Sequence, residues 1–541
     1  MLRNGLIYTV DGLRSRGEAL AIKGDTIVYI DEETGIEAWI SSHTRVLDLQ
    51  GGMVLPGFVD SHCHPSAGTI QLYEVSLVGI KEVAAYLKTM QDFLEKRPGL
   101  KVLRGMGWIN GLFPPGGPRK ELLDQVAPHI PALVRSEDGH SLWLNSRAME
   151  QAGITRQTPE VPGGVIERQA DGSPSGVLRE KAMELAAQVA PGYALRQHIE
   201  GMRFFQEQAH ALGITTVFEA GMLEWRTALQ ARQAMAASGD LKLRCRLALE
   251  VPSDADPVMK AAEIADLRSM LKNDLLKLNT AKLFMDGVIE GTTAYLEEPY
   301  LGMGGSQGKR LWEPLKFHRA CQVLDQAGLQ IHVHSVGDAA THLALDGLGH
   351  ARQANGFRDS RHALTHLQQV RPEDIRRFGE LGVVAVPQPY WFVVDENYQQ
   401  ALELLGERRA RCQYPMRSFF NAGVCVASAS DYPVVIPPDP LVAIHHGVMR
   451  CLQGMEQVPG GVLWPEERVS VEQMIYSFTR CGAYANFLEG EIGTLEPGKK
   501  ADIVVLDRDL LSIPPQEIPE VKVRLTIFNG EEVYRSPAYE G

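Results

Sequence analysis

Two histidines separated by a single residue, His62 and His64, close the apolar stretch PGFVDSHCHP. Successive side chains of a β-strand point to opposite faces of the sheet, so the two imidazoles share one face and Cys63 points to the other. Paired imidazoles of this kind are typical of a transition-metal site. An isolated His-X-His pattern more often marks two hydrogen-bonded core histidines, so its interpretation depends on what else converges on the same point.

Residues of ligand type also end four other apolar runs of the chain. They are Lys282 in AKLFMDG, His334 in IHVHSVGD, His366 in HALTHLQQ and Asp431 in SASDYPV. Imidazole and carboxylate are both common ligands of zinc, and catalytic zinc keeps an open position for water. If these runs are strands whose ends meet, the set predicts a centre for a divalent metal, Zn2+ or another divalent metal.

The middle of the chain alternates short apolar runs with longer amphipathic segments, which is typical of βα units around a parallel sheet. Eight runs are recognisable: MVLPGFVD, GITTVFEA, LRCRLALEV, NTAKLFMD, LQIHVHS, RHALTHL, GVVAVPQP and GVCVASASD. Eight such units predict an α/β fold of the (β/α)8 (TIM) barrel type, in which the carboxyl ends of the strands carry the active site. The candidate ligands would then meet at one mouth.

The two ends of the chain and the segment after the first run depart from this alternation. Short strands separated by Gly and Pro turns in residues 1–55 and 485–541 predict a small β-sandwich domain built from both termini. The barrel then spans residues 56–484. About 150 residues separate the first run from the second, far more than one crossover helix requires. An inserted subdomain is therefore expected at residues 70–195.

The charge and cysteine content of the 541 residues narrow the class of partner. The chain holds 54 basic and 67 acidic residues, a formal net charge of −13, whereas non-specific binding to nucleic acid or anionic membrane requires basic surfaces. We therefore expect a small-molecule substrate. Seven cysteines without CxxC spacing predict reduced thiols, and the stretch MLRNGLIYTVDG lacks a signal-peptide pattern, so a cytoplasmic location is expected.

The motifs taken together resemble the amidohydrolase superfamily, and within it the amidohydrolase-3 group typified by YtcJ-like proteins and N-substituted formamide deformylases. The resemblance covers nearly the whole chain, through LPGFVDSHCH, SEDGHSLWLNSRAM, GGVIERQADGSPSGVL, KLFMDG, HVHSVGDAA, HALTHLQ, PQPYW, ASASDYP and IGTLEPGKKADIVVLD. It implies a distorted barrel, a β-sandwich from both termini, an inserted domain, and one or two divalent metals that activate water. Because family members are often dimers or larger, a homodimer is one expected assembly.

Carried over position by position, the resemblance assigns six metal ligands. They are the first-strand pair His62 and His64, Lys282 on the fourth strand, His334 on the fifth, His366 on the sixth and Asp431 on the eighth. Related enzymes carboxylate the fourth-strand lysine to bridge two metals, whereas an unmodified lysine is protonated near neutral pH and cannot be a ligand. A binuclear centre with a carboxylated lysine and a one-metal centre both remain open. His332 is expected to pack or support rather than to bind metal.

The reaction implied by this resemblance is hydrolysis by metal-activated water. A bound metal can lower the pKa of water from 15.7 to about 7, and Asp431 would act as the catalytic acid/base that moves the proton to the leaving nitrogen. The leading expectation is an amidase or deacylase that cleaves the C–N bond of a small N-acyl or N-formyl compound. Hydrolysis of a cyclic amide or an ester is the alternative. A non-catalytic metal-binding relative and a metal-dependent isomerase or lyase are more distant alternatives. A ring deaminase is disfavoured because this chain lacks the HxxE motif that assists ring deamination in related barrels.

Substrate contacts are expected from further residues. His140, in SEDGHSLW, lies at a loop-like step of the inserted region, and Trp108, Tyr390 and Trp391 are candidates for an apolar pocket wall. After KLFMDG, many relatives continue with a serine- and arginine-containing stretch, whereas this chain has VIEGTTAY. That departure alters a predicted substrate-facing loop.

Overall fold

A computed structural model describes residues 1–13, 15–137 and 139–539 of the chain. Its centre is a parallel sheet of seven strands in the spatial order β20-β19-β18-β17-β16-β15-β8. The strands are β8 (Phe58–Cys63), β15 (Ile214–Glu219), β16 (Arg244–Glu250), β17 (Leu276–Phe284), β18 (Gln330–Ser335), β19 (Ala363–His366) and β20 (Val384–Val386). Their residues are almost all buried, as expected for parallel strands covered on both faces. The α/β barrel prediction is thereby confirmed.

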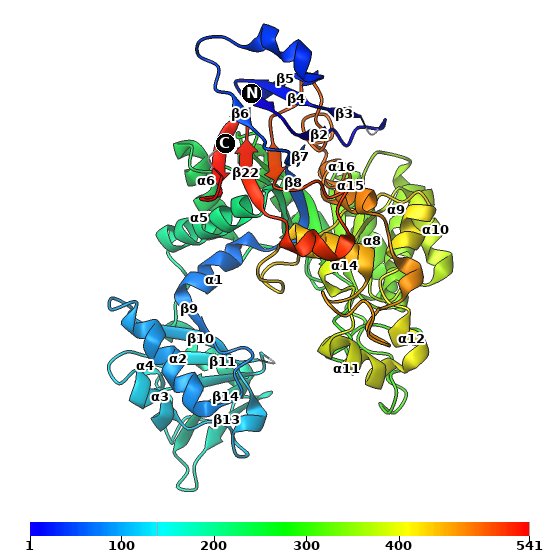
Figure 1. Cartoon of the computed structure of the whole chain (residues 1–541). Coiled ribbons are helices and arrows are strands. Elements are labelled where there is room, and N and C mark those ends of the chain that lie inside the picture. Colours follow the sequence, from blue (N-terminus) through cyan, green and yellow to red (C-terminus); the bar gives the residue numbers. More distant parts are fainter. Residues whose placement is uncertain (14, 138, 540–541) are drawn as a thin grey trace. The chain divides into compact units, whose positions relative to one another are not determined.

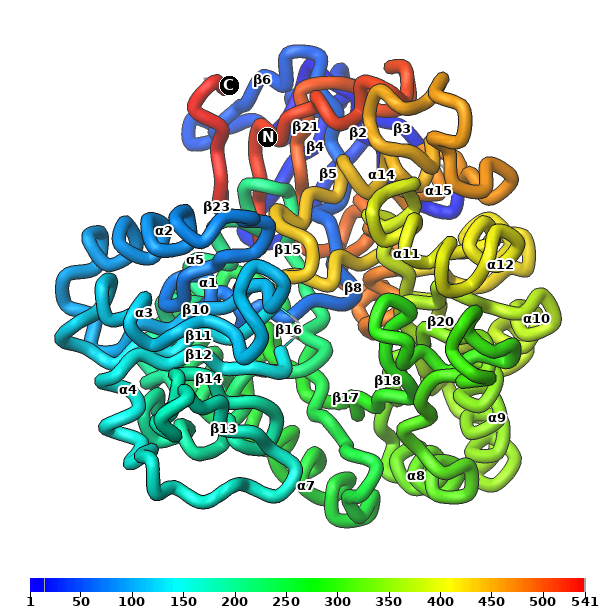
Figure 2. The backbone as a smooth tube through the Cα atoms, turned by 90° about the horizontal axis from the view of Figure 1, so that it is seen from below, coloured from blue at the N-terminus to red at the C-terminus, as the bar shows by residue number. Residues whose placement is uncertain are grey.

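Helices connect consecutive strands of the barrel, and the path from β15 to β20 can be followed in Figure 2 by its change from green to yellow. These helices are α6 (Trp225–Ser238), α7 (Pro257–Met270), α8 (Pro314–Gln326), α9 (Asp338–Asn355) and α10 (Pro372–Leu381). The longest connection among them runs from the end of β17 to the start of α8 and contains VIEGTTAY.

The eighth predicted run, GVCVASASD, closes the barrel without forming a regular strand. On one side Ala427 N donates to Ala385 O of β20 at 2.9 Å, and on the other Ser61 N of β8 donates to Ser428 O at 3.2 Å. Asp431 N then donates to His62 O at 2.8 Å. The end of this segment is therefore tied directly to the first barrel strand, beside the predicted ligand pair.

Strands from both termini form two facing sheets. One sheet has the order β23-β22-β21-β7-β2-β3 and the other the order β5-β4-β1-β6. The strands are β1 (Leu2–Arg3), β2 (Leu6–Tyr8), β3 (Arg16–Gly17), β4 (Ala19–Lys23), β5 (Thr26–Asp31), β6 (Leu47–Asp48), β7 (Met53–Pro56), β21 (Ile503–Leu506), β22 (Val523–Phe528) and β23 (Glu531–Arg535). Leu20 and Ile27 of one sheet pack with Val54, Ile503 and Leu525 of the other in a single buried cluster. The chain ends therefore lie in one β-sandwich, where Figure 1 marks N and C.

Residues 66–201 form a separate compact unit, while residues 1–65 and 202–541 form the other. The separate unit contains the predicted insert at 70–195 and extends a few residues beyond it at each end. Its sheet has the order β13-β14-β12-β11-β10-β9. The elements are β9 (Glu74–Ser76), β10 (Leu103–Trp108), β11 (Ala132–Ser136), β12 (Ser141–Leu144), β13 (Gly164–Arg168), β14 (Pro174–Glu180), α2 (Val83–Glu95), α3 (Lys120–Val126) and α4 (Ser146–Gln151). Trp108, Trp143 and Tyr86 fill its core.

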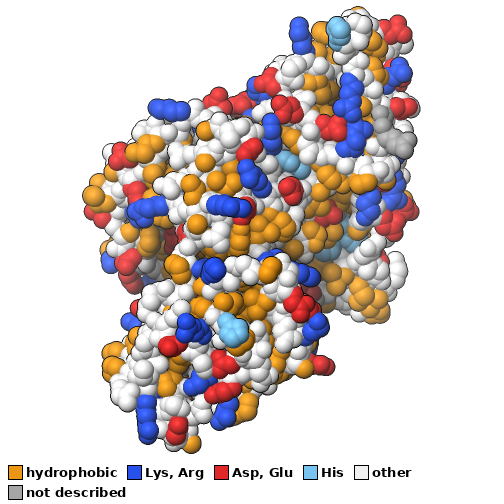
Figure 3. Space-filling model, turned by 90° about the vertical axis from the view of Figure 1, so that its left-hand side faces the viewer, with side chains coloured by type: hydrophobic (Ala, Val, Ile, Leu, Met, Phe, Trp, Pro, Cys, Tyr) orange, Lys and Arg blue, Asp and Glu red, His pale blue; other side chains and the backbone are white. Residues whose placement is uncertain are grey.

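On the face drawn in Figure 3, acidic and basic side chains are interspersed and neither kind forms a continuous patch. Among the residues that the structure describes, none of the helices combines the length and apolar character that crossing a lipid bilayer requires.

Candidate metal centre

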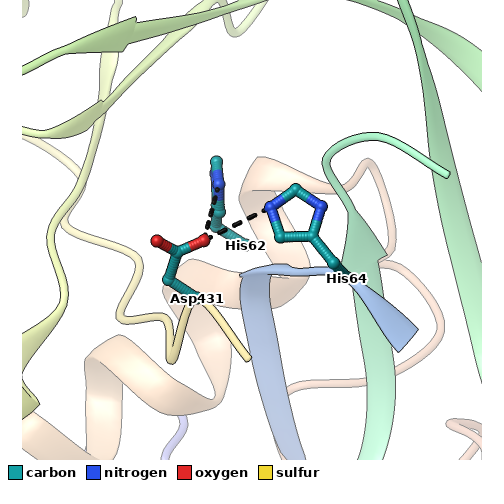
Figure 4. Close-up of side chains that lie close together, drawn as sticks. All are labelled: His62, His64 and Asp431. Carbon is teal, nitrogen blue, oxygen red and sulfur yellow. Dashed lines mark ion pairs between the residues drawn. The ribbon is translucent and has the colours of Figure 1, made fainter. Parts of the chain in front are cut away.

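Three side chains from two segments far apart in the sequence form the nucleus of the site. His62 lies in β8 and His64 follows that strand, whereas Asp431 ends the segment that closes the barrel. Asp431 Oδ1 lies 3.4 Å from His62 Nε2 and 3.3 Å from His64 Nε2, and Figure 4 shows both imidazoles beside this carboxylate. One donor atom from each of the three lies within 4.8 Å of the others. This spacing allows all three to bind one metal ion.

His334 and His366 extend the nucleus from two further strands, β18 and β19. The ring centroid of His366 lies 5.1 Å from that of His62 and 4.3 Å from that of His334. The parallel register pairs Ser335 with His366, so the two strands end together at the same rim of the barrel. The structure therefore brings together the four histidines and the aspartate that the sequence predicts as ligands.

Each of these histidines has one ring nitrogen engaged by the protein. His62 Nδ1 lies 2.8 Å from His332 Nε2, His64 Nδ1 lies 3.0 Å from Gly221 O, His334 Nε2 lies 3.1 Å from Gly287 O, and His366 Nδ1 lies 3.1 Å from Gln388 Oε1. Metal-binding histidines use such a partner to fix the tautomer and the ring orientation. With one nitrogen held in this way, the second nitrogen of each ring is available to a metal, so the donor set fits a metal centre.

The protonation states also suit metal binding. Burial lowers the pKa of His62 and of His366 well below the ordinary value, and burial lowers the pKa of His334 to about 4, so these rings stay neutral. Burial opposes charge on Asp431, but the hydrogen bond with His64 and nearby positive charge lower its pKa, so the carboxylate is ionised. Because a metal binds neutral imidazole and ionised carboxylate, these three histidines and Asp431 do not have to lose a proton first. Burial opposes charge on His64, but its hydrogen bond with Asp431 raises its pKa.

Lys282 lies at the same end of the barrel, on β17, and is 1% exposed. Its strand pairs it with His332, the partner of His62. Burial lowers the pKa of Lys282 to about 7, despite the opposing charge of Asp431. A substantial fraction of this amine is therefore uncharged near neutral pH, and an uncharged amine is the form that reacts with carbon dioxide to give a carbamate.

Two of the predicted ligands have unusual backbone conformations. His366 has φ of 75° and Asp431 has φ of 59°, in the left-handed region that residues other than glycine rarely adopt. Such strain costs of order 1–3 kcal/mol and is concentrated at functional sites. The bond from Asp431 N to His62 O, and that from Leu367 N to Ser335 O at 2.9 Å, hold these turns in place. The strained conformations therefore set the direction of two ligand side chains.

Asp286, in the KLFMDG motif, anchors the loop that follows β17 and was not predicted as a site residue. Its buried carboxylate accepts hydrogen bonds from the backbone N–H groups of Val336 at 3.0 Å, Gly337 at 2.8 Å and Tyr295 at 2.9 Å. It thereby ties the long loop to the segment just after His334. Its signal in the sequence is an acidic residue that directly follows the end of an apolar run.

A cavity of about 260 Å³ opens beside the candidate ligands and has His334, His366 and Asp431 in its wall. Its wall includes Trp391, whose ring is stacked on His366 at a centroid distance of 5.8 Å, but not Tyr390. Tyr390 is 7% exposed, and its backbone oxygen accepts a hydrogen bond from His446 Nδ1 at 3.0 Å. Of these two neighbouring candidates, Trp391 lines this cavity and Tyr390 does not, because the short turn Pro389–Trp391 directs the second side chain to the cavity.

The other two predicted substrate contacts belong to the separate unit. Trp108 is fully buried in its core, where Nε1 donates to Val134 O at 2.9 Å, so the structure gives it a packing role and does not support a substrate contact. His140 lies on the surface of that unit, with Nδ1 3.1 Å from Glu180 Oε1. Its contact with substrate stays a prediction.

Comparison with known proteins agrees with this geometry. Residues 45–534 match the model of the Amidohydrolase family (Amidohydro_3). Protein LONG AFTER FAR-RED 3 of Arabidopsis thaliana is 28% identical over 99% of this chain and 91% of its own length, and N-substituted formamide deformylase of Arthrobacter pascens is 24% identical over 98% and 97%. The crystal structure of an uncharacterized metal-dependent hydrolase from Pyrococcus horikoshii OT3 superposes with a TM-score of 0.75 at 23% identity, covering 95% of this chain and 98% of that one. With a barrel that presents four histidines and an aspartate at one rim, and a family match over most of its length, this chain belongs to the Amidohydrolase family and is a metal-dependent hydrolase of that family.

Proposed function

We propose that this protein cleaves the C–N amide bond of a small N-acyl or N-formyl compound. The observation that carries the proposal is the convergence of four histidines and an ionised aspartate at one rim of the barrel, with a cavity of about 260 Å³ beside them. The cavity is of a size for a small molecule. A relative that matches nearly the full length is an N-substituted formamide deformylase, which supports the amide assignment.

His62, His64 and Asp431 would hold one metal ion, and His334 and His366 are the candidates for a second. Zinc suits this mixture of imidazole and carboxylate. When bound, such a metal makes hydroxide available from water at neutral pH and polarises a substrate carbonyl. Carboxylation of Lys282 would add a further carboxylate to this donor set.

Asp431 is the residue that moves the proton. Its carboxylate is ionised, borders the cavity and is held by a hydrogen bond with His64, so Oδ1 or Oδ2 can accept a proton from the attacking water. The same carboxyl group can then donate that proton to the leaving nitrogen, as an acid/base residue must. Trp391, Val336 and Leu463 add apolar side chains to the cavity wall.

Metal content and hydrolysis measured on the same preparation test this function. Protein purified without chelator should contain one or two equivalents of zinc per chain and release amine and acid from N-formyl and N-acetyl alkylamines. Removal of the metal should abolish turnover and added zinc should restore it. His62→Ala should lose both metal and turnover, whereas His350→Ala, on the exposed surface of α9, is the matched control and should keep both.

If metal-loaded protein hydrolysed only esters or cyclic amides, the linear-amide assignment would be wrong. If it turned over none of the three classes while retaining metal, the chain would be a binding protein rather than an enzyme of this class.

A further inference from the structure

The cavity beside the candidate metal centre contains two carboxylates besides Asp431, namely those of Glu290 and Asp395. None of the described residues that line it is a lysine or an arginine. The other polar side chains among the described wall residues are histidines, neutral amides, tyrosines and the indole of Trp391. A substrate in this cavity therefore meets negative charge that no basic side chain in the wall balances.

Glu290 is the less compensated of the two acids. It lies in the VIEGTTAY loop, and its carboxylate accepts a hydrogen bond from Gln368. Gln368 Nε2 in turn donates to Gln413 Oε1 at 2.6 Å, and Gln413 Nε2 donates to Ala410 O. These neutral amides fix the position of the carboxylate without neutralising it. Among the residues that the structure describes, no basic side chain forms an ion pair with Glu290.

Asp395 supplies the second negative charge from the start of α11 (Glu396–Leu405). Its Oδ1 accepts a hydrogen bond from Tyr398 N at 2.9 Å, and its Oδ2 accepts one from Asn397 Nδ2 at 3.3 Å. The helix N-terminus compensates part of this charge. Asp395 also acts on Glu290 electrostatically: burial, with this neighbouring charge, raises the pKa of Glu290 above the ordinary value. The two acids therefore place negative charge close together in this part of the cavity wall.

Aromatic rings complete the wall around the acids. Trp391, Tyr398 and Tyr414 all line the cavity, and the stacking of Trp391 on His366 makes the wall continuous from the metal ligands. A cation is attracted both by aromatic faces and by carboxylates, and the attraction strengthens as water is excluded. An anionic group at this place would meet like charge and lose its hydration without a partner.

We propose that the substrate carries a protonated amino group on the amine side of its scissile amide, and that Glu290 and Asp395 bind this ammonium group. The substrate class is thus a mono-N-acyl or mono-N-formyl diamine, with an apolar spacer of a few carbons between the two nitrogens. This inference rests on the proposed amide hydrolysis. It excludes N-acyl amino acids, whose carboxylate would occupy the position of the ammonium group.

A matched series of amides with a common spacer tests the proposal. N-acetyl-1,4-diaminobutane ends in an ammonium group, N-pentylacetamide in a methyl group, and N-acetyl-5-aminopentanoate in a carboxylate; the three formyl analogues form a parallel series. With zinc-loaded protein, kcat/KM should be at least tenfold higher for the ammonium compound than for the methyl compound, and lowest for the carboxylate. Equal or reversed values would overturn the proposal.

Substitutions of the two acids test whether they cause the preference for the ammonium compound. Glu290→Gln keeps the size of the side chain and should reduce the ratio of kcat/KM between the ammonium and the methyl compound at least fivefold, mainly through KM. Asp395→Asn keeps a helix-capping residue and should reduce the same ratio less. Glu396→Gln removes the neighbouring exposed acid outside the cavity and should leave the ratio unchanged. If neither cavity substitution changed this ratio of kcat/KM, the preference would arise from other residues and the proposal would be overturned.

Binding without turnover separates this inference from the proposed function. Calorimetry should show that 1,4-diaminobutane binds the wild-type protein at least fivefold more tightly than Glu290→Gln. If no amide of the series is hydrolysed but this difference appears, the ammonium site is supported and the amide chemistry is wrong. If N-pentylacetamide is hydrolysed readily and the diamine does not bind, the amide chemistry stands and the ammonium site is wrong.

Discussion

His332 Nε2 lies 2.8 Å from Nδ1 of His62, two residues that are 270 positions apart in the chain. Since His62 Nε2 faces Asp431 and is the nitrogen available to a metal, its Nδ1 must carry the proton and donate it to His332. His332 is therefore the acceptor, and its ring is held by stacking on Phe218 at a centroid distance of 4.6 Å. His332 lies on β18, the strand that also carries His334. This strand therefore contributes one candidate ligand and fixes the tautomer of another, His62.

Replacing the acceptor tests this relationship. His332→Phe keeps a ring that can stack on Phe218 but removes the nitrogen that accepts the hydrogen bond. We expect zinc affinity to fall by about 10–100-fold, the usual effect of losing such a partner. Competition with a coloured chelator measures the change. Unaltered affinity in a folded His332→Phe protein would mean that the hydrogen bond does not set the tautomer of His62.

Asp431→Asn separates proton transfer from metal binding. Asparagine tolerates the left-handed backbone at this position better than most residues, so the fold should survive the change. We expect metal to be retained, because the histidines remain, and kcat to fall by about 10²–10⁴-fold, since an amide cannot accept the proton. Elemental analysis and steady-state kinetics on one preparation give both quantities. Normal turnover would remove Asp431 from the acid/base role.

The number of metal ions depends on Lys282. If its amine is carboxylated, wild-type protein should contain two zinc equivalents, and Lys282→Met should contain one, because the bridging carboxylate is lost. Elemental analysis of proteins prepared in bicarbonate-containing buffer measures both. Equal metal content in the two proteins would favour a one-metal centre in which Lys282 is unmodified.

Asp286 should hold the substrate-facing loop in place. Asp286→Ala leaves three backbone N–H groups, those of Tyr295, Val336 and Gly337, without their acceptor. Each buried unpaired donor costs about 1–3 kcal/mol, so we expect a loss of several kcal/mol in the free energy of unfolding or local opening of the loop. Hydrogen exchange of these three amides distinguishes the outcomes. Protection equal to that of the wild type would show that water or another group replaces the carboxylate.

A pH-dependent contribution to stability is expected from Asp325, at the end of α8. Burial opposes ionisation of this carboxyl, but hydrogen bonds with His362 and Asn355 and the charge of Arg358 lower its pKa to about 2. Because this value lies below the ordinary 3.8, the folded state favours the ionised form. The resulting stabilisation is present at neutral pH and is lost as the pH falls from about 4 through 2.

Asp325→Asn should therefore lower the free energy of unfolding by about 2 kcal/mol at pH 7, and the difference from wild type should shrink toward pH 2. Urea unfolding at several pH values measures this change. Asp274→Asn removes a 95% exposed carboxylate that pairs only with Lys277, and is the control expected to have little effect. A difference that does not vary with pH would point to lost packing rather than lost charge.

The barrel, the β-sandwich of both termini and the positions of the candidate metal ligands could be predicted from the sequence because their signals are local. Hydrophobic runs alternate with amphipathic segments, and the candidate ligands stand at the ends of these runs, as His334 does in IHVHSVGD and His366 in HALTHLQQ. Once eight parallel runs predict a closed barrel, their ends must meet at one rim. The convergence of ligands from separate strands follows without any knowledge of individual contacts.

Only the tertiary structure decided which side chains surround those ligands. Tyr390 and Trp391 are neighbours of similar character, and the direction of one short turn decides that the second lines the cavity. Trp108 is an aromatic residue of the kind that often lines a pocket, but it lies in the core of its unit. The hydrogen bond between His62 and His332, and the approach of Glu290 to Asp395, join segments far apart in the chain. Such contacts depend on packing between whole elements, which no local pattern encodes.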